Sequence, residues 1–179
     1  VSENLLCIGE TSNRLKYETN LLGTPFYLYF KEIMMETKNI SQTLEYLDKI
    51  KKNNNIFILI SNLVENNSTL VDSSKMIQYN SSNFNDYLKK YSYNRTNDSN
   101  IIFEYSEPGL LNETLLKIND FTIENIKNSI FKLFRTGGNH SMIVNKNYEM
   151  FIQVNNKNIP AFDSDIFKFN LNEVFDEKI

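Results

Sequence analysis

The sequence predicts an α+β fold in which β-sheets are covered by helices. Two helix-period segments, 25–37 and 40–52, follow each other and lead directly into the apolar, β-branched run Ile56–Ile60. Strand-like and helix-like segments then alternate towards the end of the chain, without internal repeats or a clear linker. We therefore predict a single domain over residues 1–179.

Length and composition favour one folded domain of 179 residues. Hydrophobic residues make up 41% of the chain and aromatic residues 13%, which is enough for a sizeable core. A net charge of −3, from 19 basic and 22 acidic residues, gives no basic surface for nucleic acid. No run approaches the ~18 apolar residues of a membrane span. With no visible signal peptide and a single cysteine, the sequence favours a cytoplasmic location.

The chain begins with a predicted strand over 1–9. This prediction rests on the apolar run in the second half of the segment. Thr24 is the expected N-cap of the first helix, and Pro25 sits at its first position, where a missing N–H costs nothing. The inward face of this helix carries Phe26, Tyr29, Phe30, Ile33 and Met34. Ser41 is the expected cap of the second helix, whose inward face carries Leu44, Leu47 and Ile50.

The rest of the chain is predicted to form strands around two further helices. Residues 56–60 are expected to be a central strand that is buried on both faces. The Gly137-Gly138 pair ends the later of the two helices. The expected strands are 68–72, 75–79, 140–146, 150–154 and an apolar segment over 166–169, and the expected helices are 110–118 and 122–134.

Residues 23–63 resemble the middle of the penicillin acyltransferase-like (C45-type) family of N-terminal nucleophile hydrolases. This segment has a Gly-Thr-Pro turn, a helix with acidic residues at its end, a second helix containing Leu44 and Leu47, and then a strand. The tail is similar to the closing strands of the same family, over 140–144, 150–154, 160–162 and 167–171.

The resemblance implies a four-layer αββα fold, incomplete in this chain, and hydrolysis or acyl transfer at an amide C–N bond. In such enzymes an N-terminal cysteine, freed by self-cleavage, is the nucleophile, and its own α-amino group is the base. A terminal amine has a pKa near ~8, so it can accept the thiol proton at neutral pH. The implied substrates are small amides, acyl-amino compounds and β-lactam side chains, with no metal and no cofactor.

The nucleophile is expected upstream of Val1, because the resemblance covers the C-terminal part of such proteins. For Cys7 the favoured interpretation is a buried small hydrophobic side chain, and the other is a nucleophile exposed by removal of six residues. The chain is then a separated subunit of a processed enzyme, a shortened form of one, or a relative that has lost catalysis. An upstream segment or partner chain is expected to complete the sheet.

The resemblance also implies an oxyanion-binding asparagine after the third strand of this region and an arginine before the closing strands. Asn80 and Asn83 stand at the first location, although asparagine is abundant here and favours loops for its own reasons. Arg135 stands at the second, where it supports the nucleophile or only compensates a helix dipole. Phe26 and Tyr29 are candidates for lining an acyl pocket, with core packing as the alternative.

Other polar residues fit structural roles better than catalytic ones. His140, the lone histidine, could act as a base near neutral pH, but a structural or surface role is favoured. Asp163 and Asp165 fit a solvated turn better than a paired-carboxylate site, and Gly137-Gly138 lacks the spacing of a phosphate-binding loop. The leading hypothesis is the C-terminal portion of an amidohydrolase or acyltransferase. The alternative is a non-catalytic relative that serves as a binding or structural module.

Overall fold

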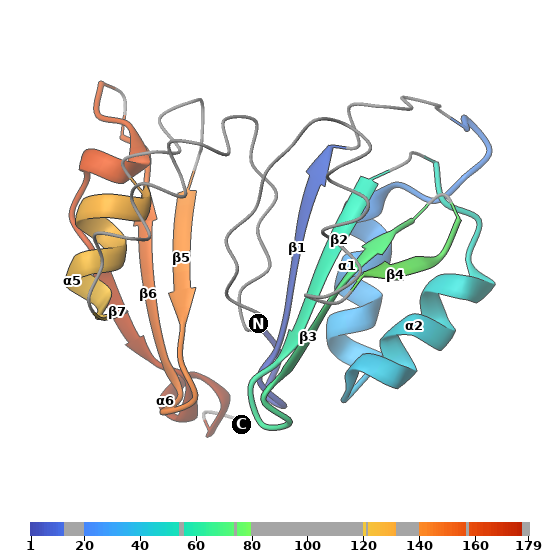
Figure 1. The fold of residues 1–179 in the computed structure, drawn as a ribbon, viewed down its shortest axis with the longest axis horizontal. Helices are drawn as coiled ribbons and strands as arrows, with labels where there is room; N and C mark the ends of the chain where they lie inside the picture. Colours follow the sequence, from blue (N-terminus) through green and yellow to red (C-terminus); the bar gives the residue numbers. More distant parts are fainter. Residues whose placement is uncertain are drawn as a thin grey trace. The chain divides into compact units, whose positions relative to one another are not determined.

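The computed structural model describes residues 1–12, 20–53, 56–73, 75–79, 120, 122–131, 140–156 and 158–176. The chain divides into two compact units, Val1–Phe84 and Asn85–Ile179. Each unit contains an antiparallel sheet together with helical segments (Figure 1). The expected mixture of helices and sheets is therefore confirmed, while the single domain over 1–179 stays a prediction.

The first unit is built on a four-stranded antiparallel sheet in the order β1-β2-β3-β4. Two helices are inserted between β1 and β2, and the remaining strands follow each other as hairpins. The elements are β1 (Leu6–Ser12), α1 (Phe26–Glu36), α2 (Ile40–Lys49), β2 (Ile56–Asn62), β3 (Asn67–Asp72) and β4 (Ile77–Tyr79).

The core of this unit lies between one face of the sheet and the two helices (Figure 1). Alternate residues of β2 point towards α1 and α2, so its even-numbered positions are buried. They pack against Tyr29 and Ile33 of α1 and Leu47 of α2, all fully buried. The core cluster is Leu6, Tyr29, Ile33, Ile40, Leu47, Ile56, Ile58, Ile60 and Val71.

The opposite face of this sheet carries apolar residues together with Ser61, Ser68 and Asp72, and it is partly exposed. Phe57 and Leu70 are buried on it, whereas Leu59 is 37% exposed and Ile77 40% exposed. Leu59 pairs with Gly9 on one side and Leu70 on the other. The prediction that residues 56–60 are buried on both faces is therefore wrong at Leu59.

The predicted bounds of the first strand and the predicted start of α1 are wrong. The first strand begins at Leu6 and continues to Ser12, instead of covering 1–9. The N-cap of α1 is Pro25 rather than Thr24, because the backbone of Thr24 is bonded to Lys51 and Asn53. These bonds hold Thr24 outside the helix.

The cap of α2 also differs from the prediction. Asn39, not Ser41, precedes the first helical residue, and its Oδ1 accepts a hydrogen bond from the Gln42 N–H at 2.9 Å. The backbone of Asn39 is extended, as an N-cap requires, whereas Ser41 is already inside the helix. The helix ends at Lys49 rather than continuing to residue 52.

The second unit contains a three-stranded antiparallel sheet in the order β5-β6-β7. A single helix was expected over 122–134, but its described part is one short α-turn followed by π-helix. The 110–118 helix lies outside the described residues, and α6 was not predicted. The elements are α5 (Ile123–Asn125), η1 (Ile126–Phe131), β5 (His140–Val144), β6 (Glu149–Val154), η2 (Ala161–Asp163), β7 (Phe167–Asn170) and α6 (Leu171–Asp176).

The two faces of this sheet differ in chemistry. On one face Gln153 is fully buried, and its Nε2 donates to the backbone oxygen of Ser164 at 2.6 Å, directly after η2. The strand registers place seven apolar side chains on the other face, and Phe167 is 53% exposed there. The apolar face consists of Met142, Val144, Met150, Ile152, Val154, Phe167 and Phe169.

Candidate functional site

Three of the five predicted site residues, Asn80, Asn83 and Arg135, lie outside the described residues. Their roles stay predictions. The other two, Phe26 and Tyr29, lie on the first and second turns of α1. The described part of a candidate site is therefore the α1 aromatic cluster and the strands that it covers.

The aromatic side chains of α1 form a cluster of edge-to-face contacts. Phe30 makes edge-to-face contacts with Phe26 and Tyr29, with ring centroids 5.6 Å and 5.3 Å apart. Tyr29 is fully buried in the core, whereas Phe26 is only half-buried at the margin of the core. Of the two side chains, only Phe26 has accessible surface that an acyl group could contact. Tyr29 can support a pocket only by packing beneath Phe26 and Phe30.

The Tyr29 hydroxyl is a buried polar group that the sequence did not indicate. It has no hydrogen-bond partner among the described residues. Burial and, secondarily, the negative charge of Glu10 raise the pKa of Tyr29 well above its usual range. The hydroxyl therefore stays protonated and is a potential donor close to Glu10 on β1.

Cys7 lies on β1, on the sheet face opposite the helices. It is half-buried, and its Sγ lies 3.9 Å from the backbone oxygen of Leu5. Burial raises the pKa of the Cys7 thiol, which disfavours the reactive thiolate. This environment suits a packing side chain rather than a nucleophile.

Lys52 is a half-buried cation at the end of α2. Its Nζ donates to the backbone oxygen of Leu47 and lies 3.6 Å from Met76 Sδ. Burial lowers the pKa of Lys52. Because Leu47 belongs to the last turn of α2, the contact neutralises the negative end of the helix dipole, which is a structural role.

Gly23 explains the Gly-Thr-Pro turn that precedes α1. A Cβ at this position would lie closer than 3.0 Å to backbone atoms of Lys52 and Asn53. Hydrogen bonds join the two segments at the same place, from the Thr24 N–H to Lys51 at 2.7 Å and from the Asn53 N–H to Thr24 at 3.1 Å. Only glycine permits this approach, which fixes where α1 starts relative to β2.

The described acidic residues form no metal centre. No group of three or more His, Cys, Asp or Glu side chains with metal-binding geometry occurs in the described part of the chain. Asp163 and Asp165 are both exposed. Glu149 accepts a hydrogen bond from Asn145 at 2.9 Å and pairs with Lys168, and these contacts lower the pKa of Glu149 and link neighbouring strands.

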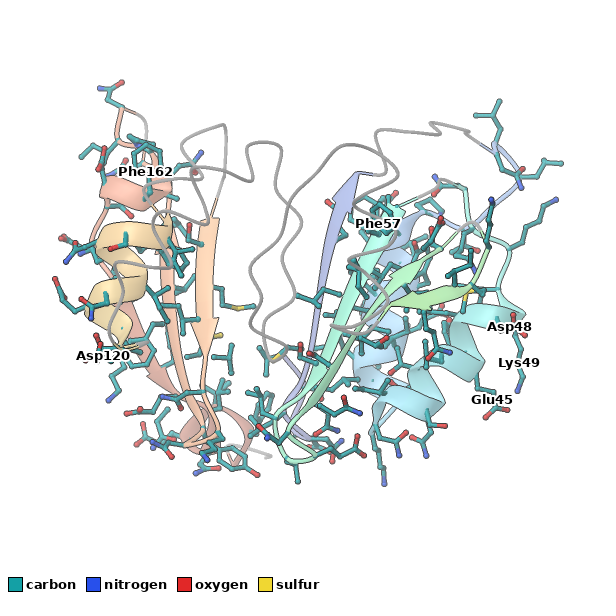
Figure 2. All side chains as sticks on the ribbon, in the orientation of Figure 1. Glu45, Asp48, Lys49, Phe57, Asp120 and Phe162 are labelled. Carbon is teal, nitrogen blue, oxygen red and sulfur yellow. The ribbon has the colours of Figure 1, made fainter. Side chains whose placement is uncertain are left out.

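The charged side chains of α2 lie on its outward side. Glu45 and Lys49 form an exposed ion pair at 2.6 Å, with Asp48 beside them (Figure 2). An exposed pair of this spacing contributes about 0.3–0.5 kcal/mol to a helix. This surface stabilises α2 and has no feature of a binding site.

Comparisons of this chain with protein-family models, curated proteins and solved structures found no significant match. None of the described helices is long and apolar enough to cross a membrane.

Proposed function

We propose that this chain is the C-terminal portion of an N-terminal nucleophile amidohydrolase or acyltransferase. The nucleophilic cysteine would come from a segment that precedes Val1 in the full-length protein. The proposal rests on the residues of 23–63 and of the tail that resemble this family. The observation that best supports it is the arrangement of residues 23–63 in the first unit.

In that unit the order is strand, helix, helix and three strands, with both helices on one face of an antiparallel sheet. The Gly-Thr-Pro turn, which is part of the resemblance to this family, brings Gly23 against the backbone of Lys52 and Asn53. Residues 23–63 therefore fold together within the first unit, which supports the proposal.

We further propose the four-layer αββα fold for the complete protein. This fold needs two sheets, each with one covered face and one apolar face that is available to another sheet. The first sheet has α1 and α2 on one face, and the other face carries Phe57, Leu59 and Leu70 together with Ser61, Ser68 and Asp72. The second sheet has Gln153 buried beneath η2 on one face and seven apolar side chains on the opposite face.

The proposed chemistry divides between the upstream segment and this chain. The terminal cysteine attacks the carbonyl carbon of a small amide or acyl-amino compound, and its α-amino group accepts the thiol proton. The resulting α-ammonium group gives this proton to the leaving amine as the C–N bond breaks, and water or an acceptor amine then cleaves the thioester. Asn80 or Asn83 would donate a hydrogen bond to the oxyanion, and Arg135 would orient a carboxylate. Phe26 would line the acyl pocket, with Tyr29 behind it. Neither a metal nor a cofactor is needed for this reaction.

The alternative is a non-catalytic relative that serves as a binding or structural module. The environment of Cys7 is compatible with both functions, since the proposed enzyme does not use this thiol. The two functions differ in whether a reactive cysteine exists elsewhere in the full-length protein.

Activity of the full-length protein separates them. We expect release of amine from simple N-acyl amino acids or phenylacetyl amides, and loss of this activity after treatment with iodoacetamide. A Cys7→Ala variant should keep the activity, because this thiol is not the nucleophile. Absence of turnover with every amide tested would favour the binding module, and loss of activity in a folded Cys7→Ala variant would contradict the upstream nucleophile.

A further inference from the structure

One edge of the first sheet has no neighbour among the described strands. β1, dark blue in Figure 1, is the outermost strand in the order β1-β2-β3-β4 and pairs with β2 over all seven of its residues. Among the described strands, none lies on its other side. Such an edge presents unpaired backbone groups and is a template for another strand.

The hydrogen bonds at the start of β1 show which backbone groups point outward. The backbone oxygen of Leu5 accepts a hydrogen bond from the Leu63 N–H, so the odd-numbered residues of β1 bond to β2. Leu6 faces the other way: its N–H donates to Ser2 Oγ and its oxygen accepts from the Ser2 N–H. By alternation, the backbone groups of Ile8 and Glu10 also point outward.

Ser2 therefore closes the edge at Leu6 only. Beyond it, Gly9 and Glu10 are exposed, and no described residue bonds to the outward backbone groups of Ile8 and Glu10. The side chain of Ile8 packs against the core on the helix-covered face. That of Glu10 shares this face by alternation, and no ion-pair partner is recorded for it among the described residues.

We propose that the outer edge of β1 binds an extended peptide strand, antiparallel to β1, with an apolar residue opposite Ile8 and a basic residue opposite Glu10. The antiparallel direction matches every other pair in this sheet. The apolar residue would extend the core beside Ile8, and the basic residue would pair with the Glu10 carboxylate. In the antiparallel direction the partner sequence is basic–x–apolar.

Charge makes a second copy of the chain a poorer partner. In a symmetric antiparallel β1–β1 pair the residue opposite Glu10 is Leu6, Ile8, Glu10 or Ser12, depending on the register, and none of these is basic. A partner strand with lysine or arginine at this position satisfies the carboxylate, whereas two facing glutamates repel each other. This binding requires no catalytic activity, since the edge of β1 alone carries it.

The test uses the synthetic peptide acetyl-Gly-Thr-Lys-Thr-Val-Thr-Gly-amide and the chain labelled with ¹⁵N. We expect the amide signals of Ile8 and Glu10 to shift with peptide concentration, and their hydrogen exchange to slow at least about tenfold at saturation. A control peptide with N-methyl groups on its lysine and valine should cause neither effect, because these two residues face Glu10 and Ile8.

Charge exchange tests the specificity. Replacing the peptide lysine by glutamate should weaken binding to the wild-type chain by about 2- to 5-fold, and Glu10→Lys should restore it for the glutamate peptide. Equal binding of the N-methylated peptide, or no change at Ile8 and Glu10 at millimolar peptide, would overturn the proposal. Protection that rises with protein concentration alone would also overturn it, in favour of a second copy.

Discussion

Substitution of Gly23 by alanine should destabilise the first unit far more than the same substitution at Gly9. The new Cβ would meet the backbone of Lys52 and Asn53 closer than 3.0 Å, and backbone atoms cannot rotate away as a side chain can. The backbone of Gly23 does not lie in the left-handed region, so the steric contact is the cause of the effect.

The expected loss of stability is about 3 kcal/mol. Forcing a methyl group into a closely packed position costs about 1–3 kcal/mol. The hydrogen bonds from Thr24 to Lys51 and from Asn53 to Thr24 cross this contact, and each net hydrogen bond contributes about 1 kcal/mol. For a chain of this size, ~3 kcal/mol corresponds to a Tm that is about 6–12 °C lower.

Gly9→Ala is the matched control in a thermal or urea unfolding experiment followed by circular dichroism. A Cβ at Gly9 would meet nothing within 4 Å, and the backbone is not left-handed there either. Its stability should stay within about 0.5 kcal/mol of the wild type or rise slightly, because alanine reduces the entropy of the unfolded chain. Equal effects of the two substitutions would refute the steric role of Gly23.

Two further predictions concern α2 and its contact with α1. Asn39→Ala removes the Oδ1 that accepts a hydrogen bond from the Gln42 N–H. The free energy of unfolding, measured in urea, should fall by about 1 kcal/mol. A loss below ~0.3 kcal/mol would contradict the capping role of Asn39. Burial and the hydrogen bond to Glu32 raise the pKa of Tyr46 to about 12. Glu32→Gln should therefore move the pKa of Tyr46, followed by tyrosinate difference spectra, towards about 10. An unchanged titration midpoint would contradict the contact. Because the raised pKa favours the neutral phenol of the folded state, its contribution to stability is complete below pH ~10 and is lost towards pH ~12.

Local periodicity predicted most described elements of the fold. The strands predicted over 68–72 and 150–154 agree with β3 and β6 to within one residue, because alternation and flanking turn residues are local signals. The cap of α1 was missed because it depends on a tertiary contact: Thr24 is held by Lys51 and Asn53 rather than by the helix that follows it. The cap of α2 is local, and the prediction placed it two residues too late, at Ser41 instead of Asn39. The π-helical geometry after Ile126 has no distinctive sequence signal.

The sequence predicted less of the site than of the fold. It identified the aromatic face of α1, but not that Tyr29 is enclosed while Phe26 remains half-buried, since helical spacing places both on one face. It gave Gly23 only a place in a turn, because the Lys52 backbone that touches it comes from a distant part of the chain. The open edge of β1 depends on strand order, which no local pattern contains.

The most direct test of the proposed enzyme is the mass of the full-length protein before and after reaction with an amide-mimicking β-lactone. We predict two chains produced by self-cleavage, with one β-lactone adduct on an N-terminal cysteine upstream of Val1 and none on Cys7. An unprocessed protein without any adduct, or an adduct on Cys7 alone, would contradict the assignment.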